Sequence, residues 1–319
     1  MTGNIIISNL TNPVLLFFLL GILAALVKSD LEIPASSSRF ISLYLLFSIG
    51  FRGGQELSHS GMDATVGLTL LLAMLLAVIV PFYVFFLMRT RMAVSDAGAV
   101  ASAYGSVSAV TFVSAASFLE ASQVHYGGHM VAAMALMEAP AIVVGVGLMR
   151  KFDKESAGQH RFRTIVHDAL TNGSVLMIVG SLFIGLIADS KQAEGIKPFT
   201  SDIFKGFLAV FLLEMGMVAA KRFKAFRHYG WFAIVAALAI PPINGLLAIG
   251  LTTFGNISAG DRLMMAILAS SASYIAVPAA MRLAAPKADP GLYIPMALGV
   301  TFPFNITVGI PFYWWLIQG

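Results

Sequence analysis

Long apolar segments alternate with short polar ones along the whole chain, and each apolar segment approaches the roughly 20 residues that a membrane-spanning helix needs. Helix-start signals, such as Asn12-Pro13, Ser95-Asp96, Ser258 with Asp261 and Asp289-Pro290, precede several of them. The pattern predicts an all-α polytopic membrane protein. We place ten transmembrane helices at residues 12–28, 39–56, 64–89, 95–122, 126–149, 164–188, 201–220, 227–254, 258–284 and 290–317.

Composition agrees with this interpretation. Of 319 residues, 58% are hydrophobic and 11% are charged, whereas a soluble domain carries about 25% charged residues. The chain has no cysteine, which excludes disulfides, thiolate metal sites and cysteine catalysis. It also has no phosphate-binding loop, zinc-ligand spacing or serine nucleophile elbow, which argues against an ATP-driven pump and an intramembrane hydrolase. We therefore expect no enzyme activity, no catalytic residues and no cofactor.

Basic residues predict the orientation, because cytoplasmic loops of membrane proteins carry an excess of lysine and arginine. With the ten spans above, fifteen of the twenty basic residues fall on one side and five on the other. The richer side is predicted to be cytoplasmic, so residues 150–163 form a cytoplasmic loop and both termini are extracytoplasmic. The net charge of +4 is then explained by the membrane rather than by nucleic acid. The five on the outer side are Arg52, Lys191, Lys197, Lys205 and Arg262.

An internal repeat divides the predicted spans into two sets of five. Four short matches occur in the same order in both sets. They pair Asn12-Pro13 with Asn172-Gly173, residues 48–51 with 214–217, residues 105–109 with 270–274, and residues 138–141 with 301–304. Because five is an odd number, the second set would be inverted in the membrane, an arrangement typical of secondary transporters. We predict a first repeat at residues 1–163, which includes the 150–163 linker, and a second repeat at 164–319.

Serine and threonine interrupt the fourth and ninth spans at matched positions. Glycine tolerates non-helical backbone and serine hydrogen-bonds to it, so both helices are predicted to break and to cross near the midplane. Two helix N-termini would then offer backbone N–H groups and positive dipole ends to a small anion. The alternative is that these small residues only pack helices closely. The candidate anion ligands are Ser106, Ser108, Thr111, Ser271 and Ser273.

Only two acidic residues, Glu138 and Glu214, fall well inside predicted spans. Ionisable side chains at membrane depth are costly and usually functional. Glu138 follows the fourth span and precedes Pro140, where its carboxylate would suit a cation. The alternative is that Glu138 only caps backbone freed by Pro140. For Glu214 the sequence leaves a functional role and a helix-packing role equally open.

The motifs resemble those of the sodium-dependent bicarbonate transporters described from cyanobacteria. The similarity covers nearly the whole chain and includes Ile49-Gly50-Phe51-Arg52-Gly53-Gly54, Gly105-Ser106-Val107-Ser108, Met137-Glu138-Ala139-Pro140 and Ala269 to Pro278. It implies a homotrimer in a bacterial inner membrane, with gate and core parts that each contain elements of both repeats. Bicarbonate would lie between the broken helices, with sodium beside it. The sodium ligands implied for this chain are Glu138, Thr111 and Ser273, and no other metal is expected.

The resulting hypothesis is sodium-coupled uptake of a small anion, with bicarbonate as the first candidate. A sodium/proton antiporter or an organic-anion symporter of related architecture is an alternative within transport. A non-transporting membrane sensor is an alternative of another class. The long cytoplasmic insertion of the cyanobacterial proteins is absent here, so the resemblance leaves a cytoplasmic regulatory partner open.

Overall fold

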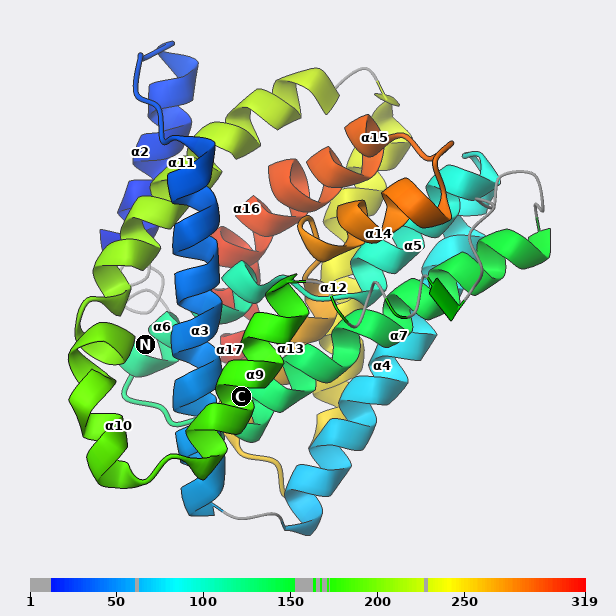
Figure 1. Cartoon of the computed structure of the whole chain (residues 1–319). Helices are drawn as coiled ribbons and strands as arrows, with labels where there is room; N and C mark the ends of the chain where they lie inside the picture. Colours follow the sequence, from blue (N-terminus) through cyan, green and yellow to red (C-terminus); the bar gives the residue numbers. More distant parts are fainter. Residues whose placement is uncertain are drawn as a thin grey trace.

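A computed structural model describes residues 13–60, 63–152, 163–164, 167, 171, 173–226 and 229–319. Regular structure in these residues is entirely helical (Figure 1). Among the described residues, six helical segments are long and apolar enough to cross a membrane, which supports a multi-pass membrane protein. These segments are Ala64–Arg89, Val94–Ala121, His129–Phe152, Ser190–Phe223, Trp231–Thr253 and Pro290–Gln318.

The other predicted spans have physical reasons to fall outside that group. Helices α2 (Pro13–Leu26) and α9 (Gly173–Ile187) are apolar but short. Helix α3 (Ala35–Ser60) is long, but its second half carries polar residues such as Arg52 and Glu56. The ninth predicted span is divided into two shorter helices. The beginning of the sixth span and most of the 150–163 linker lie outside the described residues.

Two close helix pairs run through one side of the molecule. Helix α3 packs along α9, and α2 packs along α11 (Phe204–Phe226). A Cβ atom at Gly50 of α3 would lie 2.7 Å from the Ser181 Cβ, and one at Gly216 of α11 would collide with the Phe18 carbonyl of α2. Glycine is therefore required at both crossings because the backbones approach so closely.

The remaining helices form two further packed sets. In the first, α4 (Ala64–Arg89) contacts both α5 (Val94–Gly105) and α7 (His129–Phe152). In the second, α12 (Trp231–Thr253) contacts α13 (Ala259–Ser270). It also contacts the last helical segment of the chain. In both sets, a long helix therefore contacts the next helix along the chain and a later one.

The last helical segment is irregular. It runs through α15 (Pro290–Pro295), η3 (Met296–Thr301), α16 (Phe302–Phe304), η4 (Asn305–Gly309) and α17 (Ile310–Gln318). The η segments are π-helical. Proline lacks the backbone N–H that continues an α-helix, and Pro303 lies between the two π-helical stretches.

Side-chain caps confirm two of the predicted helix starts. The Ser258 hydroxyl accepts a hydrogen bond from the Asp261 backbone N–H at 3.1 Å, at the start of α13. The Asp289 carboxylate caps α15, whose first residue is Pro290. These contacts satisfy N–H groups that have no partner within the helix.

One aspartate near the start of each broken helix fixes a loop that is distant in sequence and precedes another helix. Asp96 of α5 accepts a hydrogen bond from the Asp289 N–H at 2.8 Å. Asp261 of α13 accepts one from the Gly127 N–H at 2.7 Å. Because a charged acceptor strengthens such bonds, these contacts hold α15 against α5 and α7 against α13.

Candidate functional site

The fourth predicted span is broken where the sequence suggested. Helix α5 ends at Gly105, and α6 (Ala109–Ala121) begins after three non-helical residues. Ser106 and Ser108 have extended backbone angles, with φ of −84° and −106°. The Ser108 hydroxyl then caps α6 by accepting a hydrogen bond from the Thr111 N–H at 3.2 Å.

The ninth predicted span is broken at the matching place. Helix α13 ends at Ser270, Ser271 is extended with φ of −81°, and α14 (Ala276–Ala284) follows. The Ser273 hydroxyl accepts a long hydrogen bond of 3.4 Å from the Val277 N–H in the first turn of α14. Serine thus supports the restarted helix after both breaks.

The two breaks contact each other directly. The Ser108 N–H donates to the Ser271 hydroxyl oxygen at 2.9 Å, and the Ser273 N–H donates to the Ala103 carbonyl at 2.8 Å. The Ser271 hydroxyl donates in turn to the Leu268 carbonyl at 3.0 Å. Each broken segment therefore satisfies backbone groups of the other, which non-helical backbone at membrane depth requires.

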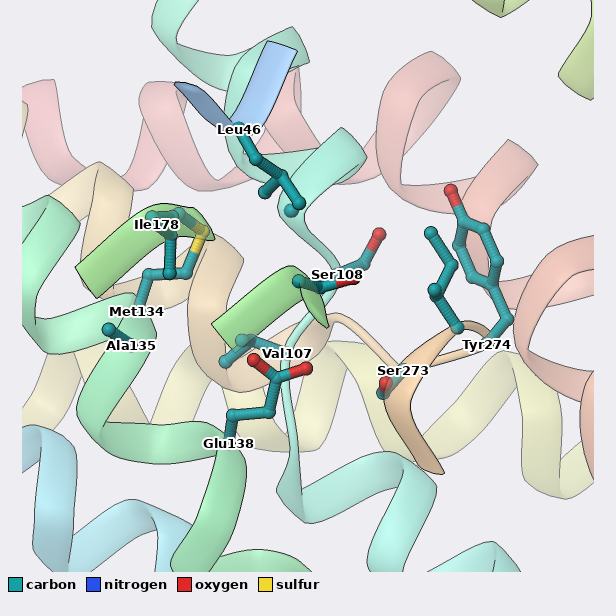
Figure 2. A pocket seen from close by; sticks show the side chains of 12 residues that line it. Leu46, Val107, Ser108, Met134, Ala135, Glu138, Ile178, Ser273 and Tyr274 are labelled. Atoms are coloured by element: carbon teal, nitrogen blue, oxygen red, sulfur yellow. The ribbon is translucent and has the colours of Figure 1, made fainter. Parts of the chain in front are cut away.

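A small cavity lies beside this contact, and it brings together three of the predicted site residues. Ser108, Ser273 and Glu138 line it, and Figure 2 shows the Glu138 carboxylate pointing towards the α5–α6 break. The cavity encloses about 30 Å³, room for a particle the size of one or two water molecules. The full lining is Leu46, Val107, Ser108, Ala109, Met134, Ala135, Glu138, Ser174, Ile178, Ser273, Tyr274 and Ile275.

One side of this cavity favours an anion, and the other side favours a cation. Ala109 is the first residue of α6, so the positive dipole end of α6 faces the cavity and favours an anion. Within the described part of the chain, the Glu138 carboxylate has no hydrogen-bond or ion-pair partner in the protein, and it favours a cation. The cavity therefore favours negative charge on its α6 side and positive charge on its Glu138 side.

The other three predicted ligands, Ser106, Thr111 and Ser271, do not line the cavity. Ser271 holds Ser108, as described above. Ser106 and Thr111 are buried, and neither hydroxyl has a hydrogen-bond partner among the described residues. Buried hydroxyls are usually hydrogen-bonded, so these two are free to serve a ligand or water.

The sequence did not indicate several residues of the cavity wall. Leu46 comes from α3, and Ser174 and Ile178 come from α9. Nothing in a single sequence pairs residues of remote helices, so no local pattern could have found them. Tyr274 follows directly on Ser273, and its position within the ninth break was the only signal for it.

A separate hollow of about 260 Å³ lies between α3, α6 and the loop before α7. Two contacts between acidic and basic side chains border it. His125 Nδ1 lies 3.2 Å from a Glu56 carboxylate oxygen, and Lys205 Nζ lies 3.1 Å from a Glu120 carboxylate oxygen. The first contact joins α3 to the loop after α6, and the second joins α11 to α6.

Comparison with known families decides the identity. A family model described as the Na⁺-dependent bicarbonate transporter superfamily matches residues 13–318, nearly the whole chain. The chain belongs to this superfamily. Membership places the protein among membrane transporters, and it confirms the family resemblance found in the motifs. No curated protein matched the chain.

Proposed function

We propose that this superfamily member takes up a small anion together with sodium, with bicarbonate as the anion. The observation that carries the proposal is the unpartnered Glu138 carboxylate beside the two touching helix breaks. A carboxylate alone at membrane depth is costly, and a bound sodium ion would offset that cost. The α6 N-terminus would hold the anion next to it.

The proposed ligands follow from this geometry. Ser108 and Ser273 reach the anion from the cavity wall, while Ser106, Thr111 and Ser271 support it from behind with hydroxyl and backbone groups. Sodium is a hard cation that prefers oxygen ligands. Glu138 would supply its charge, with the hydroxyls of Thr111 and Ser273 as neutral ligands. No cofactor is required beyond sodium as the coupling ion.

The proposed architecture is two inverted five-helix repeats, at residues 1–163 and 164–319. Matched contacts support it. The atoms nearest to Gly50 belong to Ile178, Ser181 and Leu182, while those nearest to Gly216 belong to Phe18, Gly21 and Ile22. The two sets have the same spacing along α9 and α2. The paired α2–α3–α9–α11 helices would form the gate, and the helices that include both breaks would form the core.

Transport would proceed by alternating access, with the core moving against the gate. Two larger hollows lie on opposite predicted sides of the membrane, and of these two the cytoplasmic one shares lining residues with the small cavity. Contacts of Glu56 and Glu120 join gate and core on the predicted outer side. On the predicted cytoplasmic side, a cavity of about 460 Å³ shares lining residues with the small one.

We further propose a homotrimer in a bacterial inner membrane, with both termini outside. Helix α2 exposes Leu16, Leu20 and Leu23, which suits contact with lipid or with a second copy. Cysteines placed at Ser156 and Gly319 test the orientation, because the chain has no cysteine of its own. An impermeant thiol reagent outside intact cells should label position 319 and spare position 156. The reverse labelling would refute the orientation.

Uptake of labelled bicarbonate into proteoliposomes tests the function. We expect an inward sodium gradient to drive accumulation, and a collapsed gradient to abolish it. Accumulation driven by a proton gradient instead, or by an organic anion in place of bicarbonate, would favour the corresponding alternative transporter. No accumulation of any of these solutes by correctly folded protein would favour a membrane sensor.

A further inference from the structure

A larger cavity adjoins the candidate site on the predicted cytoplasmic side. It encloses about 460 Å³ and lies between α3, α9, α11 and the break before α14. Ser174, Tyr274 and Ile275 line both this cavity and the small one beside Glu138. These three residues therefore form the wall between the two spaces.

Glu214 of α11 lines the larger cavity. One of its carboxylate oxygens, Oε2, is buried and has no hydrogen-bond partner within the described part of the chain. Ser38 of α3 lies close enough to interact with the carboxylate, and the Tyr274 hydroxyl lies within its electrostatic reach. Tyr274 lines both cavities, so a single side chain lies between Glu214 and the candidate site.

Helix packing does not account for Glu214. At the closest approach of α11 to α2, the α11 residues in contact are Leu213, Gly216 and Met217. The cavity is lined by Phe211, Glu214 and Met215, which occupy another face of the same helix. An ionisable side chain that faces a cavity at membrane depth is a functional candidate, because its burial is not offset by packing.

The neighbours of Glu214 have the chemistry of a site for a hard cation. Three serines, Ser38, Ser42 and Ser174, supply further oxygen atoms on the same cavity wall. Arg39 also lines the cavity, but no ion pair joins it to Glu214 among the described residues. A monovalent hard cation with oxygen ligands would compensate the carboxylate charge.

We propose that Glu214 forms a second cation-binding site, separate from Glu138, which receives the coupling ion on its way to the cytoplasm. In this account the ion leaves Glu138, passes Tyr274 and is held by the Glu214 carboxylate with serine oxygens before release. The inference rests on the proposed function for the identity of the ion, sodium. The existence of the site rests only on Glu214 and its cavity.

Equilibrium binding of labelled sodium to the full chain purified in detergent tests the site. The Glu214→Gln variant keeps the side-chain shape and removes the charge, so it should lose one of the sodium ions that the wild-type chain binds. Glu194→Gln is the matched control, because Glu194 lies on the fully exposed helix α10 (Ser190–Lys197). Glu214→Asp keeps the charge and should retain the ion with weaker affinity. Unchanged sodium binding in Glu214→Gln would overturn the proposal.

A comparison with Glu138→Gln separates this site from the first one. The two single variants should each lose a different ion, so the double variant should lose both. Loss of all sodium in either single variant would mean one shared site and would also overturn the proposal. If wild-type protein binds sodium at Glu214 but shows no sodium-driven uptake, the proposed function fails while the binding site stands.

Transport measurements can show on which side of the membrane Glu214 binds sodium. In membrane vesicles loaded with sodium, internal sodium should inhibit uptake by occupying the site on the cytoplasmic side. We expect Glu214→Gln to raise the internal concentration for half-inhibition by about tenfold, the effect of losing one charge-assisted contact. The external sodium concentration for half-maximal uptake should stay near the wild-type value. A large rise in the external value with no change in the internal one would contradict a release site.

Discussion

The two halves of the chain, residues 13–152 and 173–319, show the same construction with different chemistry. Each half contributes a glycine to a close crossing with the other half, a helix broken after its first 12 residues, and an aspartate that fixes a loop of the other half. The two halves differ in the helix that comes after both parts of the broken helix. The first half places Glu138 there, and the matching residue of the second half is Thr301 by the sequence repeat.

Thr301 and Glu138 also differ in whether their side chains have hydrogen-bond partners. Thr301 is fully buried, shares a hydrogen bond of 2.7 Å with the Tyr104 hydroxyl, and donates to the Ala237 carbonyl at 2.9 Å. Glu138 faces a cavity, and no described side chain or backbone group is hydrogen-bonded to it. Of these two matched positions, Glu138 is therefore the one that is available to an ion.

The largest expected effect tests the shared construction. Gly216→Ala and Gly50→Ala should each destabilise the protein, by about 3 kcal/mol, because the added methyl group meets backbone or Cβ atoms of the neighbouring helix. Thermal unfolding in detergent measures the change. Gly180→Ala is the control, since a Cβ there meets nothing within 4 Å. If all three variants unfold alike, the matched crossings do not hold the halves together.

A smaller effect on stability should distinguish the break in the second half from the break in the first half. Ser271→Ala removes the acceptor of the Ser108 N–H and leaves that buried donor unpaired, at a cost of about 2 kcal/mol. Ser106→Ala, at the corresponding place of the first half, removes a hydroxyl with no partner among the described residues and should leave stability unchanged. Unfolding midpoints of both variants check this. Equal losses would show that the breaks are equivalent.

The smallest expected effect concerns anion affinity. Thr111→Val keeps the shape of the side chain and removes its buried hydroxyl, and Ser273→Ala removes a hydroxyl of the cavity wall. Each should weaken bicarbonate binding by about tenfold, the loss of one hydrogen bond to a charged ligand. The concentration for half-maximal uptake provides the measurement. Wild-type affinity in both variants would place the anion elsewhere.

Local chemistry explains what the sequence could predict of the fold. Glycine and serine are tolerant of extended backbone, so the breaks at Ser106–Ser108 and after Ser270 were foreseeable. Caps at Ser258 and Asp289 followed from known preferences as well. The π-helical stretches around Pro303 did not, because proline predicts an interruption but not its form.

The candidate site was predictable in part for the same reason. Glu138, Ser108 and Ser273 were singled out by polarity within apolar segments, and they line one cavity. The positions of Ser106 and Thr111 behind the wall depend on side-chain direction around a break, which sequence spacing does not define. The contribution of α9 depends on packing between distant helices.

The sodium dependence of bicarbonate uptake in Glu138→Gln tests the central claim most directly. Glutamine keeps the shape and hydrogen-bonding capacity of the side chain but removes the charge that would compensate sodium. With normally assembled protein, we predict that sodium no longer stimulates uptake in this variant, while Glu138→Asp keeps a weaker stimulation. Full sodium-stimulated uptake by Glu138→Gln, with the wild-type sodium dependence, would contradict the account and leave Glu138 with a structural role beside Pro140.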